Sequence, residues 1–193
     1  MEEKINAYIK NQMEALSKLE EDNKIIQNIF SVLKTARDDG SKIFIMGNGG
    51  SASTASHFTA DLLKTSILKE EKRFKAFCLS DNIPVLLAWA NDSSYDEVFV
   101  GQLENFLEKG DVVVGISGSG NSSNVIKAIE FAKKNNNTTI SLTGKDGGKL
   151  AKLAKINLTI KSKDMLTIES LHLIVCHAVT TLFRKDGEPL FSY

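Results

Sequence analysis

The strongest constraint on the fold is an alternation of short apolar runs with helical segments along the 193-residue chain. Residues 43–46 are apolar, residues 111–116 (DVVVGI) are mostly β-branched, and both runs are too short for helices, which is typical of strands buried on both faces. With three similar runs they predict a sheet of about five strands, at 42–46, 75–79, 111–116, 138–143 and 156–160. Segments with helical spacing lie between and after them, at 52–66, 83–91, 98–107, 125–134, near Leu150 and at 166–183. Since strands joined through helices run parallel, the chain is predicted to be an α/β protein, a three-layer αβα sandwich with a mainly parallel sheet.

The N-terminal segment predicts a helical extension in front of this sandwich. Residues 3–38 carry apolar residues at helical spacing, interrupted by the polar sequence at 20–23. We expect two helices, with Asp22 or Asn23 as the N-cap of the second. The first helix has apolar residues to bury before the core begins, so residues 1–38 are interpreted as a subunit contact. No repeat or linker divides the chain, and one domain is expected over 1–193.

Composition argues against several classes of protein. Lys+Arg and Asp+Glu both count 24, and no basic stripe is visible, so a nucleic-acid partner is not expected. Cys78 and Cys176 lie in apolar surroundings and suggest neither a disulfide framework nor a zinc finger, which favours a reduced, cytoplasmic protein. The charged start at residues 1–4 and the lack of an 18-residue apolar run argue against secretion and against a membrane span.

Two glycine-rich loops each follow a predicted strand and precede a predicted helix, at 47–51 (GNGGS) and 117–122 (SGSGNS). Glycines let backbone N–H groups approach a ligand, and a helix N-terminus adds partial positive charge. The second loop adds the hydroxyls of Ser117, Ser119 and Ser122, which suit the many acceptor oxygens of a terminal phosphate. Ligands of open α/β sheets bind at the carboxyl ends of the strands, so both loops predict a phosphate site. The alternative, two ordinary glycine turns with serine caps, stays open.

The two glycine-rich loops match the known nucleotide-binding motifs less well than they match a simple phosphate site. A dinucleotide fold needs an acidic residue at the end of the second strand, and Asp81 lies too far along the chain. A Walker A loop needs Gly-Lys-Ser/Thr after the glycines, and that sequence is absent.

A group of histidines and carboxylates predicts a metal site. His57 and Asp61 are four residues apart and share one helix face. Glu169 and His177, on the last helix, are eight residues apart, about 80° around the axis, and can share a broad face. Two imidazoles and two carboxylates suit zinc or another divalent metal. In the alternative interpretation His172 and His177 are ordinary helix histidines and Asp61 is solvated. Cys176 is expected in the core, not as a nucleophile.

Taken together and in order, these motifs resemble the sugar isomerase (SIS) domain family over nearly the whole chain. The resemblance is closest to the members that isomerise sedoheptulose 7-phosphate. It is carried by the sequences at 47–51, 57–58, 91–92, 115–122 and 142–148 and by His177.

The resemblance implies a metal-dependent aldose–ketose isomerase that acts through an enediolate and makes a heptose 7-phosphate for surface polysaccharides. It implies one zinc ion per subunit, or another divalent metal, held by His57, Asp61, Glu169 and His177, with Asp61 as base and His177 as acid. A homotetramer is implied as well. The substrate-binding residues that it implies are Asn48, Gly49, Gly50, Ser51, Asp61, Asn91, Asp92, Ser117, Gly118, Ser119, Ser122 and Glu169.

Three positions depart from the pattern of the family. Asp61 replaces a glutamate, Glu169 replaces a glutamine, and Gly118 replaces a threonine. Aspartate is one methylene shorter than glutamate, which affects the geometry of a base. Two alternatives therefore stay open: a non-catalytic SIS protein that binds a sugar phosphate or a replication initiator, and an SIS isomerase for another substrate such as a ketohexose phosphate.

Overall fold

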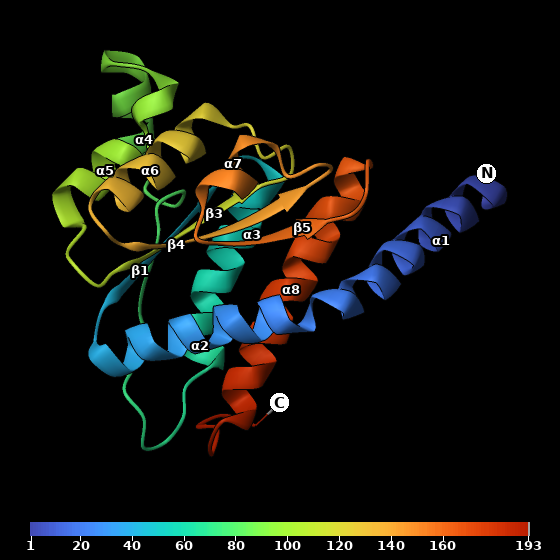
Figure 1. Cartoon of the computed structure of the whole chain (residues 1–193), viewed down its shortest axis with the longest axis horizontal. Coiled ribbons are helices and arrows are strands. Elements are labelled where there is room, and N and C mark those ends of the chain that lie inside the picture. Colours follow the sequence, from blue (N-terminus) through green and yellow to red (C-terminus); the bar gives the residue numbers. More distant parts are fainter. Residues whose placement is uncertain (193) are drawn as a thin grey trace.

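A computed structural model describes residues 1–192, which form one five-stranded sheet in the order β2-β1-β3-β4-β5 (Figure 1). Every neighbouring pair of strands is parallel, and Ile43 pairs with Val112 while Val112 pairs with Thr138. The strands are β1 (Lys42–Gly47), β2 (Lys75–Cys78), β3 (Val112–Ser117), β4 (Thr138–Gly144) and β5 (Ile156–Ile160). The predicted sheet is confirmed, and its strands lie within one or two residues of the expected ranges.

Helices cover both faces of the sheet and make three layers. One face carries α2 (Asn23–Asp39), α3 (Gly50–Ala60) and α8 (Met165–Lys185), and the other carries α4 (Ile83–Asp92), α5 (Val100–Phe106), α6 (Ser123–Lys134) and α7 (Gly148–Leu153). Side chains alternate along β1, so Ile43 and Ile45 join the core beside α8, while Phe44 and Met46 join the core beside α6. The predicted three-layer sandwich is thus confirmed.

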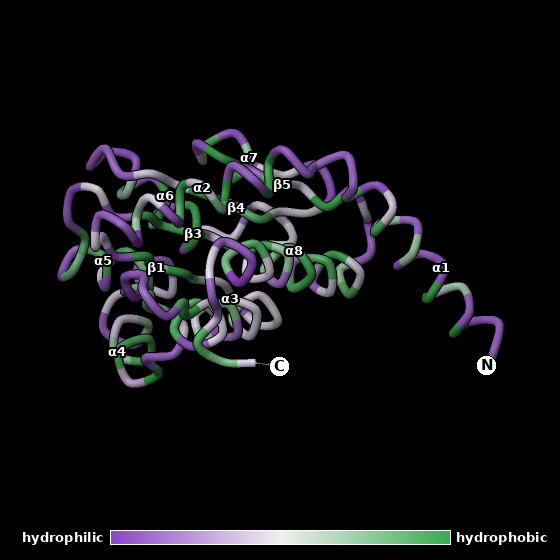
Figure 2. Tube along the Cα trace, turned by 90° about the horizontal axis from the view of Figure 1, so that it is seen from below, coloured by the Kyte–Doolittle hydropathy of each residue, from purple (hydrophilic) through white to green (hydrophobic). Residues whose placement is uncertain are grey.

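The N-terminal helix α1 (Glu2–Leu19) projects away from the rest of the molecule (Figures 1 and 2). A 3-10 turn at Glu20–Asp22 separates it from α2, at the predicted break. Near its end α1 buries Ala15 and Leu19, whereas Ile5, Ile9 and Met13 are exposed. Figure 2 shows hydrophobic residues recurring along α1. The expected contact with another subunit would cover this face, and it stays a prediction.

The order of the strands places a switch point between β1 and β3. From β1 the chain crosses to β2 at one edge, and β3 then lies on the opposite side of β1. Connections that diverge in this way leave a crevice at the carboxyl ends of the two strands, where ligands of open α/β sheets bind. The two glycine-rich loops are the segments that follow β1 and β3.

The predicted helix at 52–66 is divided in two. After α3 ends at Ala60, one π-helical turn, η2, runs over Asp61–Thr65, and the Ser66 N–H donates to the Asp61 carbonyl at 2.8 Å. Single π-turns are frequent at functional sites because they redirect one side chain on a helix.

By length and composition alone, α8 could span a membrane. Half of its apolar window is buried in the fold, and Ile168, Leu171, Val175 and Phe183 belong to the core. It is the core helix of one layer.

Candidate functional site

The serine loop, residues 117–122, begins where β3 ends and leads into α6. A turn closes it through the Gly120 N–H, which donates to the Ser117 carbonyl at 2.9 Å. The Ser117 hydroxyl lies 3.0 Å from that of Ser122 and 3.4 Å from that of Ser119. The three predicted hydroxyls therefore converge at the N-terminus of a twelve-residue helix, where an anion is favoured.

A neighbouring turn supports the serine loop from behind. Gly120 has φ +64°, and a Cβ at this position would collide with the Gly147 carbonyl, so only glycine fits. The Leu150 N–H donates to the Gly120 carbonyl at 2.9 Å, and the Lys149 N–H donates to the Asn121 side chain at 3.1 Å. The loop is thus fixed by backbone contacts with the segment after β4.

The glycine loop, residues 47–51, is joined to the serine-loop helix by a pair of amides. The Asn48 Nδ2 donates to Asn124 at 2.9 Å, and the Asn124 Nδ2 donates back to Asn48 Oδ1 at 3.0 Å. The Tyr95 hydroxyl donates to the same Asn48 oxygen at 2.9 Å. Sequence reasoning missed Asn124 and Tyr95. For Asn124 a signal was present, an asparagine two residues after the end of the serine loop.

The structure brings three of the four predicted metal ligands together. His57, on α3, and His177, on α8, approach with their Nε2 atoms 3.0 Å apart. The Asp61 Oδ2 lies 3.7 Å from the His57 nitrogen and 3.8 Å from the His177 nitrogen. Thr180, one turn along α8, directs its hydroxyl at the same oxygen from 3.4 Å. Asp61 is buried rather than solvated, with its side chain 13% exposed, while both histidine side chains are 48% exposed.

The spacing of these donors fits a metal ion. The circle through three points separated by 3.0, 3.7 and 3.8 Å has a radius of about 2.05 Å, within the range of Zn–N and Zn–O bond lengths. Two imidazoles and one carboxylate form a common ligand set for catalytic zinc, which keeps a further position for water or substrate. His57, Asp61 and His177 could therefore hold a zinc ion or another divalent metal.

Glu169, the fourth predicted ligand, lies outside this group. Its carboxylate rests against Gly50 in the first turn of α3. The prediction used the angle between Glu169 and His177 around α8, whereas eight residues also separate them by a rise of about 12 Å. Glu169 thus borders the glycine loop, and its role as a metal ligand stays a prediction.

The predicted pair Asn91 and Asp92 lies at the exposed end of α4. The Asn91 Nδ2 donates to the Asp92 carboxylate at 2.7 Å. The chain continues from there into the short turn that carries Tyr95, which contacts the glycine loop. A role for the pair in substrate binding stays a prediction.

Gly118 lies against Met165 at the start of α8. A Cβ on Gly118 would collide with the Met165 sulfur. Met165 therefore occupies the space that a side chain at position 118 would need.

Burial shifts the pKa values of three other titratable side chains near the site. His172 is fully buried, and its Nε2 lies 2.9 Å from the Thr143 carbonyl. Burial lowers its pKa to about 4, so it is neutral at pH 7. Burial raises the pKa of the Cys176 thiol well above its usual range, as expected for a core residue without nucleophilic character. Cys78, which is half-buried, has its pKa raised to about 11 for the same reason.

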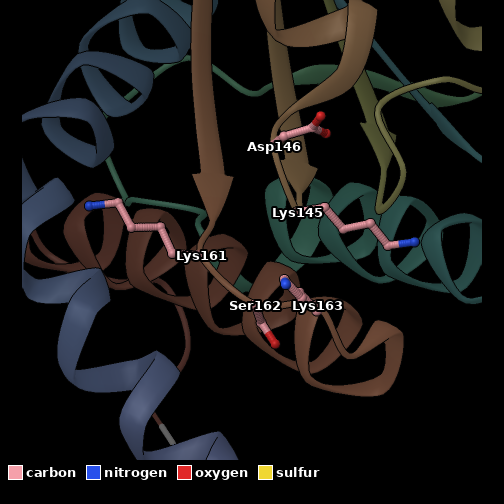
Figure 3. A pocket seen from close by; sticks show the side chains of 5 residues that line it. All are labelled: Lys145, Asp146, Lys161, Ser162 and Lys163. Carbon is pink, nitrogen blue, oxygen red and sulfur yellow. The ribbon is translucent and has the colours of Figure 1, made fainter.

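Two open cavities adjoin the site. One, of about 500 Å³, is lined by Ala52, Ser53, Ser56, His57 and Asp81, and lies beside the metal-ligand group. The other, of about 640 Å³, lies past the ends of β4 and β5 and is lined by Lys145, Asp146, Lys161, Ser162 and Lys163 (Figure 3).

Comparisons with known proteins agree on one family. Residues 7–144 match the family model of the SIS domain. The chain is 41% identical to a phosphoheptose isomerase of Helicobacter pylori (strain P12) over 177 residues, which are 92% of this chain and 88% of that protein. Its fold is similar to the solved phosphoheptose isomerase of Neisseria gonorrhoeae, with a TM-score of 0.88, 31% identity, and coverage of 95% and 98% of the two chains. A phosphoheptose isomerase structure from Francisella tularensis matches with a TM-score of 0.86 and 26% identity, over 95% and 97% of the chains.

Proposed function

Because the chain belongs to the SIS domain family, alongside phosphoheptose isomerases, we propose that it interconverts sedoheptulose 7-phosphate and an aldoheptose 7-phosphate. The protein is thus proposed to be a sugar-phosphate isomerase. The observation that carries the proposal is the convergence of His57, Asp61 and His177, from two helices that are far apart in the sequence, in a fold whose glycine and serine loops form an anion site.

The loops hold the phosphate end of the substrate in this proposal. The hydroxyls of Ser117, Ser119 and Ser122 converge at the N-terminus of α6, where phosphate oxygens can accept hydrogen bonds. Asn48 and the backbone of Gly49, Gly50 and Ser51 border the substrate from the β1 side, and Asn91 and Asp92 contribute from the end of α4.

Asp61 acts as the base that moves a proton between C1 and C2 of the sugar through an enediolate. Its carboxylate is largely buried and lies within 3.8 Å of both histidine nitrogens, which confines it to one place. His177 serves the oxygen side as acid, the role that the resemblance to the family implies for it.

A zinc ion or other divalent metal, one per subunit, would supply polarisation of the substrate carbonyl and neutralisation of the developing negative charge. His57, Asp61 and His177 would hold it, and Glu169 is the predicted fourth ligand. The aspartate at 61 and the glutamate at 169 change both the reach of the base and the charge of the site, so the reaction rate is the property most sensitive to these departures.

The biological setting follows the same family. We place the protein in the cytoplasm as a homotetramer whose product enters synthesis of surface polysaccharides. The apolar residues exposed along α1, and cysteines that are both free, support this setting.

A single experiment tests the proposal against its alternatives. The purified protein, with its metal content measured, is incubated in deuterated water with sedoheptulose 7-phosphate and with ketohexose phosphates. We expect conversion of the heptose phosphate, with deuterium at C2 of the aldose or at C1 of recovered ketose. Turnover of hexose phosphates alone would indicate a different SIS isomerase. Binding without turnover or exchange would indicate a non-catalytic sugar-phosphate protein.

A further inference from the structure

The cavity in Figure 3 lies at the same edge of the sheet as the phosphate loops, yet the proposed function does not use it. Lys145 directly follows β4, and Lys161 directly follows β5, so both lysines stand at carboxyl ends of strands. Lys163 and Ser162 complete the lining, with Asp146 on the opposite side. With three lysines and one carboxylate, the lining carries a net positive charge.

Lys145 has an unfavourable backbone conformation. Its φ is +57°, in the left-handed region that residues with a Cβ rarely adopt. Two hydrogen bonds fix it there: the Lys145 N–H donates to the Ser162 carbonyl at 3.2 Å, and the Gly147 N–H closes the turn onto the Gly144 carbonyl at 2.9 Å. Glycine would adopt this conformation without strain, so the lysine side chain is present at a cost to stability.

This turn lies beside the serine loop. Ser117 pairs with Thr143 at the ends of β3 and β4, so the two chains leave the sheet side by side. A Cβ on Gly144 would be 2.8 Å from the Gly118 carbonyl oxygen. Gly144 therefore packs directly against the serine loop, and Lys145 is the next residue along the chain.

The lysines of the cavity point in different directions. In Figure 3, Lys145 extends toward the side where β3 ends, and Lys161 extends the opposite way. Lys161 is engaged by Glu21 at 3.1 Å, while within residues 1–192 Lys145 has no carboxylate partner. Its charge is thus available on the serine-loop side of the cavity.

The serine loop itself carries no charge between residues 117 and 124 (SGSGNSSN). A phosphate monoester has a charge of about −1.5 to −2 at pH 7 and is bound more strongly beside a cation. We propose that Lys145 is a substrate-positioning residue that supplies the positive charge for the phosphate held on the serine loop. This inference rests on the proposed function for the identity of the phosphate ester.

Lys145→Gly separates the proposed role from a structural one, because the two roles predict opposite effects on stability. The variant loses the charge and also the strain. We expect its dissociation constant for inorganic phosphate and its KM for sedoheptulose 7-phosphate to rise about tenfold, with kcat little changed. Its thermal midpoint should rise by about 2–4 °C. Lys145→Arg should keep the affinity.

Two variants serve as controls. Asn136→Gly changes the one further non-glycine residue with positive φ among residues 1–192, just before β4, and should leave phosphate affinity unchanged. Lys152→Gln removes an exposed charge from α7 and should behave like the parent protein.

Unchanged phosphate affinity in Lys145→Gly would overturn the inference, and so would lack of phosphate binding by the parent protein. A loss of affinity accompanied by a lower thermal midpoint would overturn it as well, because Lys145 would then support the loop mechanically. If phosphate binding depends on Lys145 but no heptose phosphate is turned over, the inference holds and the proposed function fails. If Lys145→Gly turns over sedoheptulose 7-phosphate with an unchanged KM, the proposed function holds and the inference fails.

Discussion

The two halves of the candidate site are built in different ways. The glycine loop and the serine-loop helix are held together by hydrogen bonds. The side-chain amides of Asn48 and Asn124 donate to each other at 2.9 and 3.0 Å. The group of His57, Asp61 and His177 is assembled by the packing of α3 against α8, and its carboxylate lies 3.7 and 3.8 Å from the two nitrogens. Two imidazole nitrogens 3.0 Å apart need a proton or a cation between them. The loops are thus held together without a ligand, whereas the two histidines and Asp61 form a group that could also hold a metal ion.

The largest effect is expected from Asp61→Asn, which keeps the shape of the side chain and removes its charge. Turnover of sedoheptulose 7-phosphate should fall about 10³-fold, because the variant loses the base and one ligand together. Binding of inorganic phosphate to the loops should stay within about twofold of the parent protein, since the loops do not depend on this residue. Steady-state kinetics and calorimetry measure the two quantities.

Glu104→Gln, an exposed carboxylate on α5, is the matched control and should keep full turnover. A loss of less than tenfold in Asp61→Asn would contradict the role of the base. A parallel loss of phosphate binding would show that the two halves are coupled.

The response to metal should also differ between the halves. Zinc at about 100 times its dissociation constant stabilises a protein by about 2.7 kcal/mol, which is about 5–10 °C in thermal midpoint for a chain of this size. We expect this shift in the parent protein and its loss in His177→Ala. Removal of metal by a chelator should abolish turnover and leave phosphate binding in place.

Ser170→Ala, on the same helix as His177, should keep the zinc response, because its hydroxyl bonds only the helix carbonyl of Leu166. A zinc shift that persists in His177→Ala would place the ion elsewhere.

The fold could be predicted more completely than the site. Parallel strands buried on both faces leave continuous apolar runs such as residues 112–116, and glycine-rich loops follow two of those runs. Helix ends were predicted less well at one point, where the π-turn at Asp61–Thr65 replaced the last turn of the expected helix. That turn depends on tertiary packing, which local sequence preferences do not record.

Within the site, three of the four residues grouped from the sequence as metal ligands lie together, and Glu169 lies apart from them. His57 and Asp61 were paired correctly because four residues make one helical turn. Glu169 was grouped by its angle around α8, and the rise along the axis separates it from His177. Asn124 and Tyr95 were missed because their partner Asn48 lies in a distant loop, and only the folded sheet brings these segments together.

A third prediction concerns His172, which ties helix α8, the helix that carries His177, to the end of β4. Its pKa is about 4 in the folded protein, against an ordinary value of 6.5, because burial disfavours the charged ring. The unfolded chain therefore binds a proton at higher pH than the folded chain does. The stability due to the neutral ring is complete above pH 6.5 and is lost as the pH falls toward 4, by about 2 kcal/mol at pH 5.

Denaturant titrations at pH 7 and pH 5 check this, with His172→Gln as the comparison. The difference between the two pH values should be smaller in the variant by about 2 kcal/mol, while both proteins should respond alike between pH 7 and pH 8. An equal loss in both proteins on acidification would assign the acid sensitivity to other groups.

The smallest of these effects is expected from Asn124→Ala, which acts on the loops and not on the histidine group. The substitution leaves the Asn48 amide without its partner at the start of α6, and an unsatisfied polar group of this kind costs about 1.5 kcal/mol. KM for sedoheptulose 7-phosphate should rise several-fold, and the zinc-induced shift in thermal midpoint should stay as in the parent protein. Asn105→Ala, which removes an amide bonded only to the Gly101 carbonyl of its own helix, should change neither quantity. If Asn124→Ala abolished the zinc shift, the loops would be organising the metal-ligand group, and the two halves would form one cooperative unit.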